Sequence, residues 1–245
     1  MGSAREQRER EFWATSPEEQ PGAFSLRLLT HKMGEARVLL EKLNAFRDVF
    51  AGAATIVELG AGQAWASCAV AHEFGDRHRI VATDIAFDAV VSHHRWEELL
   101  DGCPSGVAAC RSASLPFRDG SVDLVFAFAA AHHFGTQRTT LLEVARVLRP
   151  GGHALYLHEP ACPPWIYPVA YRRVMRKRPV VPEDVLRYPE IEQLGEAAGL
   201  ATEVRFAPTT TYRAPVETVY YLALSKLRPL QRVLPCTADF VFTKR

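Results

Sequence analysis

Apolar residues follow two alternating patterns along this chain. Short continuous apolar runs, bounded by glycine, proline or acidic residues, are typical of strands buried on both faces of a parallel sheet. Such runs occupy 56–59, 79–84, 107–110, 122–131, 153–157, 202–206 and 240–243. Between them, stretches with a single apolar stripe at helical spacing predict helices at 32–50, 65–74, 87–100, 135–148 and 189–199. The alternation predicts an α/β fold with helices on both faces of a mainly parallel sheet.

The bulk composition restricts the functional classes. A chain of 245 residues with 48% hydrophobic and 23% charged residues suits one globular domain. The net charge of +1 provides no overall field for nucleic acid or for a membrane, and no apolar run has the length of a membrane-spanning helix. The charged N-terminus is unlike a signal peptide, and the five scattered cysteines form no pattern typical of zinc or disulfides. We therefore expect a cytoplasmic protein with no nucleic acid and no membrane partner.

The first predicted strand ends in an acidic residue and two glycines. Gly60 and Gly62 let the backbone approach a ligand closely. A dinucleotide fingerprint would place a third glycine at position 65, where this chain has Trp65. Glu58 would repel a diphosphate and suits a ligand that presents hydroxyl or ammonium groups. The turn therefore favours a cationic nucleoside over a pyrophosphate.

These residues resemble a known family. The stretch 58–62 (Glu-Leu-Gly-Ala-Gly) looks like motif I of the class I S-adenosylmethionine-dependent methyltransferases, and 146–152 resembles that family's connection into strand five. The likeness covers about 54–160 and points to the methyltransferase type 11 group, including small-molecule and sugar O-methyltransferases. It implies a Rossmann-like doubly wound sheet of seven strands, with strand seven antiparallel. The implied cofactor is S-adenosyl-L-methionine.

The resemblance also assigns cofactor-binding residues. We expect Asp84, at the end of the second strand, to bind the ribose hydroxyls, although it could instead cap the following helix. The family usually has an acidic residue that reads adenine about where this chain has Arg111, so Ser112 or backbone atoms must serve. The full set of expected cofactor-binding residues is Glu58, Gly60, Ala61, Gly62, Gln63, Asp84, Ile85, Ser112, Ala113 and Ala129.

Two histidines follow the fourth strand, where methyl donor and acceptor would meet. A hydroxyl acceptor needs a base to take its proton, and imidazole is suited to that task. We expect His133, or else His132, to be this base, with Glu159 at the end of strand five orienting the imidazole. Either histidine could instead be structural. A divalent metal held by these residues and His158 is an alternative, but we expect no metal.

The flanks depart from the family pattern. An N-terminal helical arm, 1–50, has Trp13 and Phe24 as apolar anchors that either dock it or make it a lid. Two insertions, 161–190 after strand five and 208–235 between strands six and seven, would form a cap over the strand ends and supply the acceptor pocket. The first insertion has a basic run at 172–178, which is either a solvated helix face or a site that captures an anionic acceptor.

The sequence thus predicts one methyltransferase domain that acts on a hydroxyl of a small molecule, a sugar or a natural-product intermediate. Methylation of nitrogen or carbon is the alternative within the fold, and a non-catalytic protein that binds S-adenosylmethionine is the alternative outside it. The place after strand four lacks the Asn/Asp-Pro-Pro-Tyr/Phe motif of base methyltransferases. We expect a monomer or a homodimer.

Overall fold

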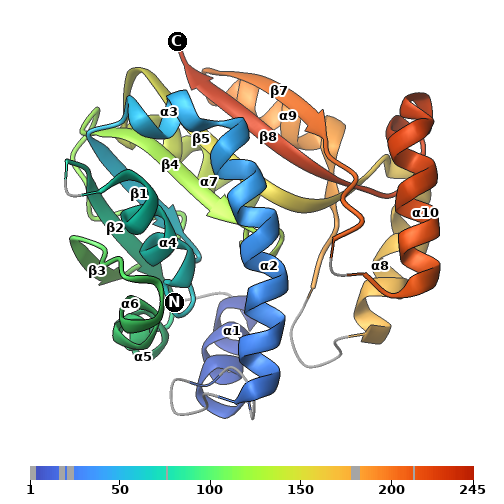
Figure 1. The fold of residues 1–245 in the computed structure, drawn as a ribbon. Helices are drawn as coiled ribbons and strands as arrows, with labels where there is room; N and C mark the ends of the chain where they lie inside the picture. Colours follow the sequence, from blue (N-terminus) through green and yellow to red (C-terminus); the bar gives the residue numbers. More distant parts are fainter. Residues whose placement is uncertain (1–3, 17–19, 21–24, 76, 178–182, 212) are drawn as a thin grey trace.

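A single mixed sheet organises the molecule. The structure, a computed structural model, describes residues 4–16, 20, 25–75, 77–177, 183–211 and 213–245. Within these residues the sheet has eight strands (Figure 1). They are β1 (Thr55–Leu59), β2 (Arg79–Asp84), β3 (Gly106–Ala109), β4 (Val122–Phe128), β5 (Leu148–Cys162), β6 (Leu186–Arg187), β7 (Leu200–Phe206) and β8 (Cys236–Lys244).

The strand order is β3-β2-β1-β4-β5-β8-β7, and the short β6 pairs in parallel with the end of β5. The first five strands of this path are parallel, whereas β8 runs antiparallel to both β5 and β7. The predicted doubly wound sheet with an antiparallel last strand is therefore confirmed. The extra strand β6 was not predicted, because a two-residue strand has no periodicity to detect.

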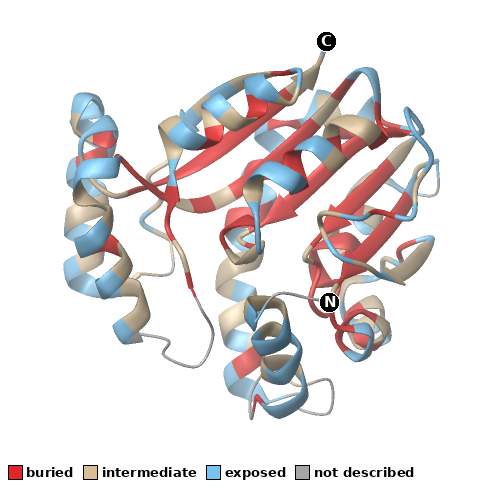
Figure 2. Cartoon of the chain, turned by 180° about the vertical axis from the view of Figure 1, so that it is seen from behind, coloured by how far each residue is buried: buried red, intermediate tan, exposed pale blue. Residues whose placement is uncertain are grey.

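Helices cover both faces of the sheet (Figures 1 and 2). They are α1 (Ala4–Thr15), α2 (Leu26–Ala45), α3 (Arg47–Ala51), α4 (Trp65–Phe74), α5 (Phe87–Val90), α6 (His94–Leu100), α7 (Gln137–Val147), α8 (Tyr167–Lys177), α9 (Tyr188–Ala197) and α10 (Pro215–Lys226). Short 3₁₀ turns are η1 (Val91–His93), η2 (Ala131–His133), η3 (Pro164–Ile166) and η4 (Arg228–Arg232). None of the described helices combines the length and apolar character that crossing a membrane requires.

The core has two halves, one on each face of the sheet. Along β4, Leu124 and Phe126 pack against the side covered by α2, α3 and α4, whereas Val125 and Ala127 pack against the side of α7 and α9. Successive strand side chains point to opposite faces, so both faces of this central strand must be apolar. This explains why its sequence reads as a continuous apolar run.

Several predicted boundaries were wrong for local reasons. Strand four ends at Phe128 rather than at position 131, because Ala129 turns to φ +48° and donates its N–H to Leu157 O at 2.9 Å. The helix expected to reach Leu148 ends at Val147, since Leu148 already pairs with Val122 in the sheet. Strand five is accordingly 15 residues long, with β8 alongside most of it.

The two insertions lie side by side at one end of the sheet, where α8 and α10 stand next to each other (Figures 1 and 2). An ion pair joins them, Arg173 Nη2 to Glu217 Oε1 at 3.0 Å. Phe24 and Arg178, named in the sequence predictions, lie outside the described residues. The N-terminal helix α1 lies instead beneath the carboxyl ends of the central strands, close to the start of α2 (Figure 1).

Candidate active site

The glycine turn after β1 has the close approach that the sequence predicts. Gly60 and Gly62 have φ of +68° and +52°, a region that side chains disfavour. A Cβ at Gly60 would lie 3.0 Å from Ala130 Cβ and 3.1 Å from the Phe134 ring. The turn is therefore packed against the segment that follows β4, which is the segment of the two histidines.

Glu58 is buried at the end of β1, beneath this turn. Its carboxyl group accepts a hydrogen bond from Ser67 Oγ at 2.5 Å. Burial raises the pKa of Glu58 to about 8, because removing a carboxyl group from water disfavours its ionised form. Glu58 is therefore largely protonated at neutral pH in the ligand-free protein and would ionise beside an ammonium group.

Asp84 joins the end of β2 to the glycine turn. Its carboxylate accepts from Gly62 N and from Ala86 N, both at 2.8 Å, and burial raises its pKa to about 6. The alternative that Asp84 caps the following helix does not fit the geometry, since Ala86 is the residue before α5. Asp84 therefore orders the turn.

One cavity opens onto these groups and collects most of the predicted cofactor residues. Those lining it are Glu58, Gly60, Ala61, Gly62, Gln63, Asp84, Ile85, Ser112 and Ala129. Ala113 is not among the lining residues. Gln63 also accepts from the Trp96 indole N–H at 2.8 Å, and Ser112 Oγ lies 2.9 Å from Thr140 Oγ1, so both are held in place by the fold.

The helix α1 forms a cover over this cavity. From the sequence, its role was open between simple docking on the core and a lid. Trp13 lies so close to Gly62 that a Cβ there would be 2.7 Å from its ring. None of the residues of α1 is fully buried, so the helix contributes little to the core. The side chains it gives to the cavity are Glu6, Glu9, Phe12 and Trp13.

Arg111 serves to hold this cover. Its Nε donates to Glu6 Oε1 of α1 at 2.8 Å. Arg5 adds a second attachment, donating from Nη2 to the backbone oxygen of His132 at 2.5 Å. The position at which the family usually reads adenine therefore attaches the N-terminal helix in this chain.

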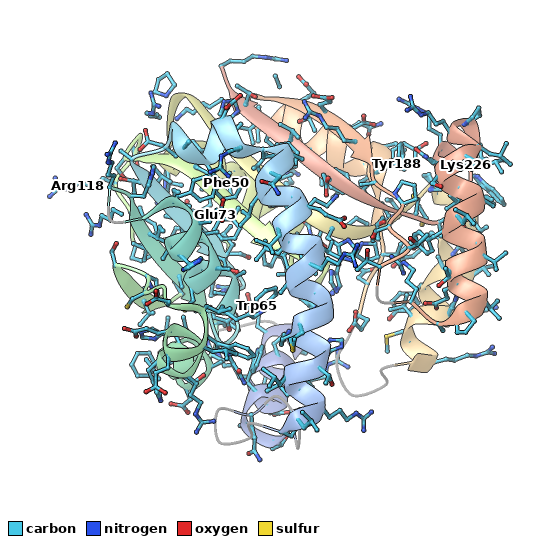
Figure 3. All side chains as sticks on the ribbon, viewed as in Figure 1. Phe50, Trp65, Glu73, Arg118, Tyr188 and Lys226 are labelled. Carbon is cyan, nitrogen blue, oxygen red and sulfur yellow. The ribbon has the colours of Figure 1, made fainter. Side chains whose placement is uncertain are left out.

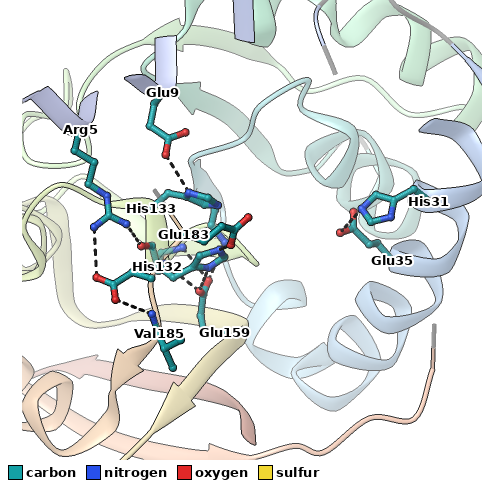
Figure 4. A network of polar contacts seen from close by, with 12 residues as sticks. Arg5, Glu9, His31, Glu35, His132, His133, Glu159, Glu183 and Val185 are labelled. Carbon is teal, nitrogen blue, oxygen red and sulfur yellow. Dashed lines mark hydrogen bonds and ion pairs between the residues drawn. The ribbon is translucent and has the colours of Figure 1, made fainter. Parts of the chain in front are cut away.

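His132 is buried between two carboxylates (Figure 4). Its Nδ1 lies 2.7 Å from Glu159 Oε2, and its Nε2 lies 3.1 Å from Glu183 Oε2. Burial would lower the pKa of His132, but the two carboxylates outweigh it and raise the pKa to about 10. A histidine that is protonated at neutral pH, with both nitrogens occupied, is poorly suited to accept a proton from a substrate.

Glu159 is fully buried and holds the turn η2 together. Besides the His132 ring it accepts from the backbone N–H groups of Ala130, Ala131 and His132, at 2.8–3.1 Å. Burial alone would raise its pKa, but His132 and these donors lower it. The orienting carboxylate expected from the sequence thus contacts His132, not His133.

His133 faces the cavity and is positioned from α1. Its Nδ1 lies 3.0 Å from Glu9 Oε1 (Figure 4), and no described residue hydrogen-bonds its Nε2. The rings of His132 and His133 are 4.1 Å apart between centroids. Glu9 could not be found from the sequence, because nothing in the composition of α1 relates it to residues more than a hundred positions away.

A metal could in principle find ligands here. His132, His133 and Glu183 each offer an atom within 4.8 Å of the others. Both ring nitrogens of His132 are already in contact with carboxylates, so an ion at this place would have to displace the contact with Glu183. His158, the other histidine considered from the sequence, is no part of this group; it stacks on Phe128 with centroids 5.9 Å apart.

The insertions contribute little to the described part of the cavity. Glu183 is the one described lining residue from the first insertion, and none comes from the second. The N-terminal elements contribute more, since α2 adds Leu28, His31, Lys32 and Glu35 to the lining residues of α1. The sequence missed these residues because the apolar stripe of α2 drew attention to its buried face alone.

Comparison with known proteins agrees with this geometry. Residues 57–156 match the family model described as "Methyltransferase domain". No curated protein sequence matches the chain. The resemblance to class I S-adenosylmethionine-dependent methyltransferases is confirmed for this domain, and the domain implies S-adenosylmethionine as cofactor.

Solved structures share the fold at low sequence identity. Phosphoethanolamine N-methyltransferase 2 of Haemonchus contortus, in complex with S-adenosyl-L-methionine, has a TM-score of 0.62 and 14% identity over 96% of this chain and 59% of its own. The YcgJ protein of Bacillus subtilis has 0.58 and 18%, over 78% and 92%. Geranyl diphosphate C-methyltransferase of Streptomyces coelicolor A3(2), with Mg²⁺, geranyl diphosphate and S-adenosyl-L-homocysteine, has 0.57 and 12%, over 78% and 72%. At these identities the likeness concerns the fold alone.

Proposed function

We propose that this chain, whose residues 57–156 form a methyltransferase domain, transfers a methyl group from S-adenosylmethionine to an oxygen or nitrogen of a small molecule, with His133 as the base. The observation that carries the proposal is the place of His133. It lines the same cavity as Gly60 and Asp84, and Glu9 holds its Nδ1. Its other nitrogen, Nε2, hydrogen-bonds no described residue and would be available to an acceptor.

The cofactor would lie on the glycine turn. Asp84 would accept hydrogen bonds from the ribose hydroxyls, and Glu58 would pair with the ammonium group of the methionine part. Ile85 and Ser112 would border the adenine. The donor sulfonium is already activated, so the protein mainly aligns donor and acceptor and excludes water. Trp13 and Phe12 serve the exclusion, since α1 covers the cavity.

His133 would take the acceptor's proton on Nε2 while Glu9 stabilises the imidazolium through Nδ1. The imidazole is suited to an alcohol, a sugar hydroxyl or an ammonium group that must lose a proton before or during attack. His132 and Glu159 would act as positioning residues, because they fix the turn η2 on which His133 lies.

The charge of the lining supports a neutral or cationic acceptor. Besides Glu58 and Asp84, the lining includes Glu6, Glu9, Glu35 and Glu183, and Lys32 is its one lysine or arginine among the described residues. Lys32 is itself paired with Glu35 at 2.8 Å. Of the basic residues that suggested an anionic acceptor, the described ones lie on α8, and none of them lines this cavity. An amine is therefore the second candidate acceptor, since carboxylates and aromatic rings together suit a cation.

The test is methyl transfer from labelled S-adenosylmethionine to a panel of alcohols, sugars, primary and secondary amines and carboxylic acids. Transfer to hydroxyl or amine acceptors is expected, and transfer confined to carboxylic acids would contradict the acceptor class. Calorimetry on the same preparation separates binding from turnover. Cofactor binding without transfer to any acceptor would favour the non-catalytic alternative, and absence of cofactor binding would overturn the proposal.

A further inference from the structure

Two segments of the insertions, 163–177 of the first and 208–235 of the second, differ sharply in charge from the rest of the chain. Residues 163–177 and 208–235, here called the insertion surface, include eight lysines and arginines and a single acidic residue, Glu217. Their net charge is +7, so the remaining residues together carry −6. The one acidic group is already paired, because Glu217 accepts from Arg173. The overall charge of +1 therefore hides a strongly basic region.

The same region exposes an unusual number of apolar side chains. The two segments make up about a sixth of the sequence, yet they hold seven of the 13 large hydrophobic side chains exposed in the described part of the chain. Val216, Val219 and Leu222 form a stripe along α10 and are 82%, 69% and 51% exposed. On η3 and α8, Trp165 and Val169 are 65% and 64% exposed.

These exposed residues are not needed to pack the two helices. Helix α8 has an inner apolar contact of its own, in which Ala170 packs with Cys162 and Val185. Helix α10 is held from within by buried Leu224 and by Tyr220, whose hydroxyl donates to Pro235 O at 2.7 Å. The outer apolar stripe is therefore left for something other than the protein's own core.

We propose that the insertion surface docks on a bilayer that contains anionic lipids. Helices of 11 and 12 residues, with aliphatic and aromatic side chains exposed and cations beside them, have the composition of interfacial segments that lie in the headgroup layer. Arginine and lysine are attracted to anionic headgroups, while valine, leucine and tryptophan enter the boundary with the acyl chains. A protein partner fits less well, because protein interfaces have few charged residues at their centre.

The proposal is independent of the methyltransferase assignment and is tested without turnover. The protein is sedimented with vesicles of phosphatidylcholine alone and with vesicles containing about one-third phosphatidylglycerol. We expect binding to the anionic vesicles, weakened by salt, and little binding to phosphatidylcholine. No sedimentation with the anionic vesicles, or equal binding to both kinds, would overturn the proposal. Absence of vesicle binding together with salt-sensitive binding to polyglutamate would assign the surface to an acidic protein instead.

Two matched pairs of variants locate the contact. V216E/V219E should lower the partition onto anionic vesicles about tenfold or more, whereas L99E/L142E, which alters exposed leucines on α6 and α7, should leave it unchanged. Wild-type circular dichroism and thermal unfolding establish that the first variant is folded. Wild-type partition by folded V216E/V219E would overturn the assignment.

A charge pair keeps the proposal testable if the apolar variant fails to fold. Lys226 and Arg118 lie at opposite sides of the molecule (Figure 3). K226Q/R228Q should weaken binding to anionic vesicles, and R79Q/R118Q, with the same change in net charge, should weaken it much less. Equal losses of vesicle binding in the two variants would mean that net charge alone drives binding. That result would overturn the assignment of binding to the insertion surface.

Discussion

His132 and His133 are adjacent in the chain, with ring centroids 4.1 Å apart, yet the two rings lie in different environments. His132 has both ring nitrogens against buried carboxylates, whereas His133 has one nitrogen against Glu9 and lines the cavity. Substitutions at the two positions should therefore fail in different ways.

Replacing His133 should affect turnover and little else. We expect H133A to lower the turnover rate about 100- to 10,000-fold with cofactor affinity nearly unchanged, because a general base acts only in the chemical step. E9Q should lower the turnover rate less than H133A, since it leaves the base in place and removes only the carboxylate charge beside it. Single-turnover kinetics and calorimetry measure the two quantities, with H94A, at an exposed histidine outside the lining, as control. Turnover by H133A at the wild-type rate would contradict general-base catalysis by His133.

Replacing His132 should instead lower stability. H132A leaves the Glu159 and Glu183 carboxylates buried without their cation, and breaking a buried ion pair in this way costs about 3–5 kcal/mol of unfolding free energy. Urea unfolding measures the loss, and H132Q, which keeps hydrogen-bonding capacity, should lose less. A loss within about 0.5 kcal/mol, as at an ordinary surface site, would contradict this role.

The same contribution should depend on pH. The pKa of His132 is raised from its ordinary 6.5 to about 10 in the folded protein. Its stabilising effect is therefore fully present below about pH 6.5 and is lost as the pH rises through about 10. The difference in unfolding free energy between wild type and H132Q should shrink over that range. A constant difference would show that His132 does not change protonation there.

Cofactor affinity should rise with pH through the titration of Asp84. Its pKa is raised to about 6 by burial, and the ionised form is the better acceptor for ribose hydroxyls. D84N should lose at least about tenfold in affinity and most of the dependence between pH 5 and 7, whereas D88N, at an exposed acid just beyond, should keep both. Calorimetry between pH 5 and 7 measures the affinity. A wild-type affinity that does not change with pH would contradict the assignment of Asp84 to the ribose.

Binding should also release a proton from Glu58. With its pKa raised to about 8 in the ligand-free protein, Glu58 is mostly protonated at pH 7 and would ionise when the cofactor's ammonium group arrives. The apparent binding enthalpy should then differ between phosphate and Tris buffers, and the difference should vanish in E58Q. Identical enthalpies for the wild type in both buffers would count against this pairing.

A chelator should leave turnover unchanged. The group formed by His132, His133 and Glu183 has the spacing for an ion, but both ring nitrogens of His132 already contact buried carboxylates. Dialysis against EDTA followed by the transfer assay measures this. Loss of activity restored by a divalent cation would require the metal alternative.

The sequence was most informative where local pattern and tertiary role coincide. The bounds of α4 and β2 were predicted to the residue, and most predicted cofactor residues line one cavity, because Gly60, Gly62 and Asp84 follow directly from strand ends. It was least informative about α1, whose polar helix has no apolar stripe. The contacts of Glu9 and Trp13 with the cavity depend on where α1 packs against the rest of the protein. Hydrophobic periodicity does not predict that position.

The charge of the insertions shows a different limit. The whole-chain charge led to the expectation of no membrane partner, but it averages over an uneven distribution: the segments 163–177 and 208–235 together carry +7 and the remaining residues −6. The expectation that these insertions line the acceptor pocket rested on the loops that border one edge of the sheet. That reasoning did not consider the N-terminal helix, which precedes the sheet in the sequence.

The ring of Trp13 occupies the space directly above Gly62. If the cofactor lies on the glycine turn as proposed, the indole must shift to make room for it, so we expect α1 to move when the cofactor enters or leaves and to close again over the bound cofactor. The contacts that resist withdrawal, Arg111 to Glu6 and Arg5 to the chain at His132, are then determinants of residence time. The rate at which used cofactor is exchanged for fresh cofactor would thus depend on α1, which belongs neither to the sheet nor to the reacting groups.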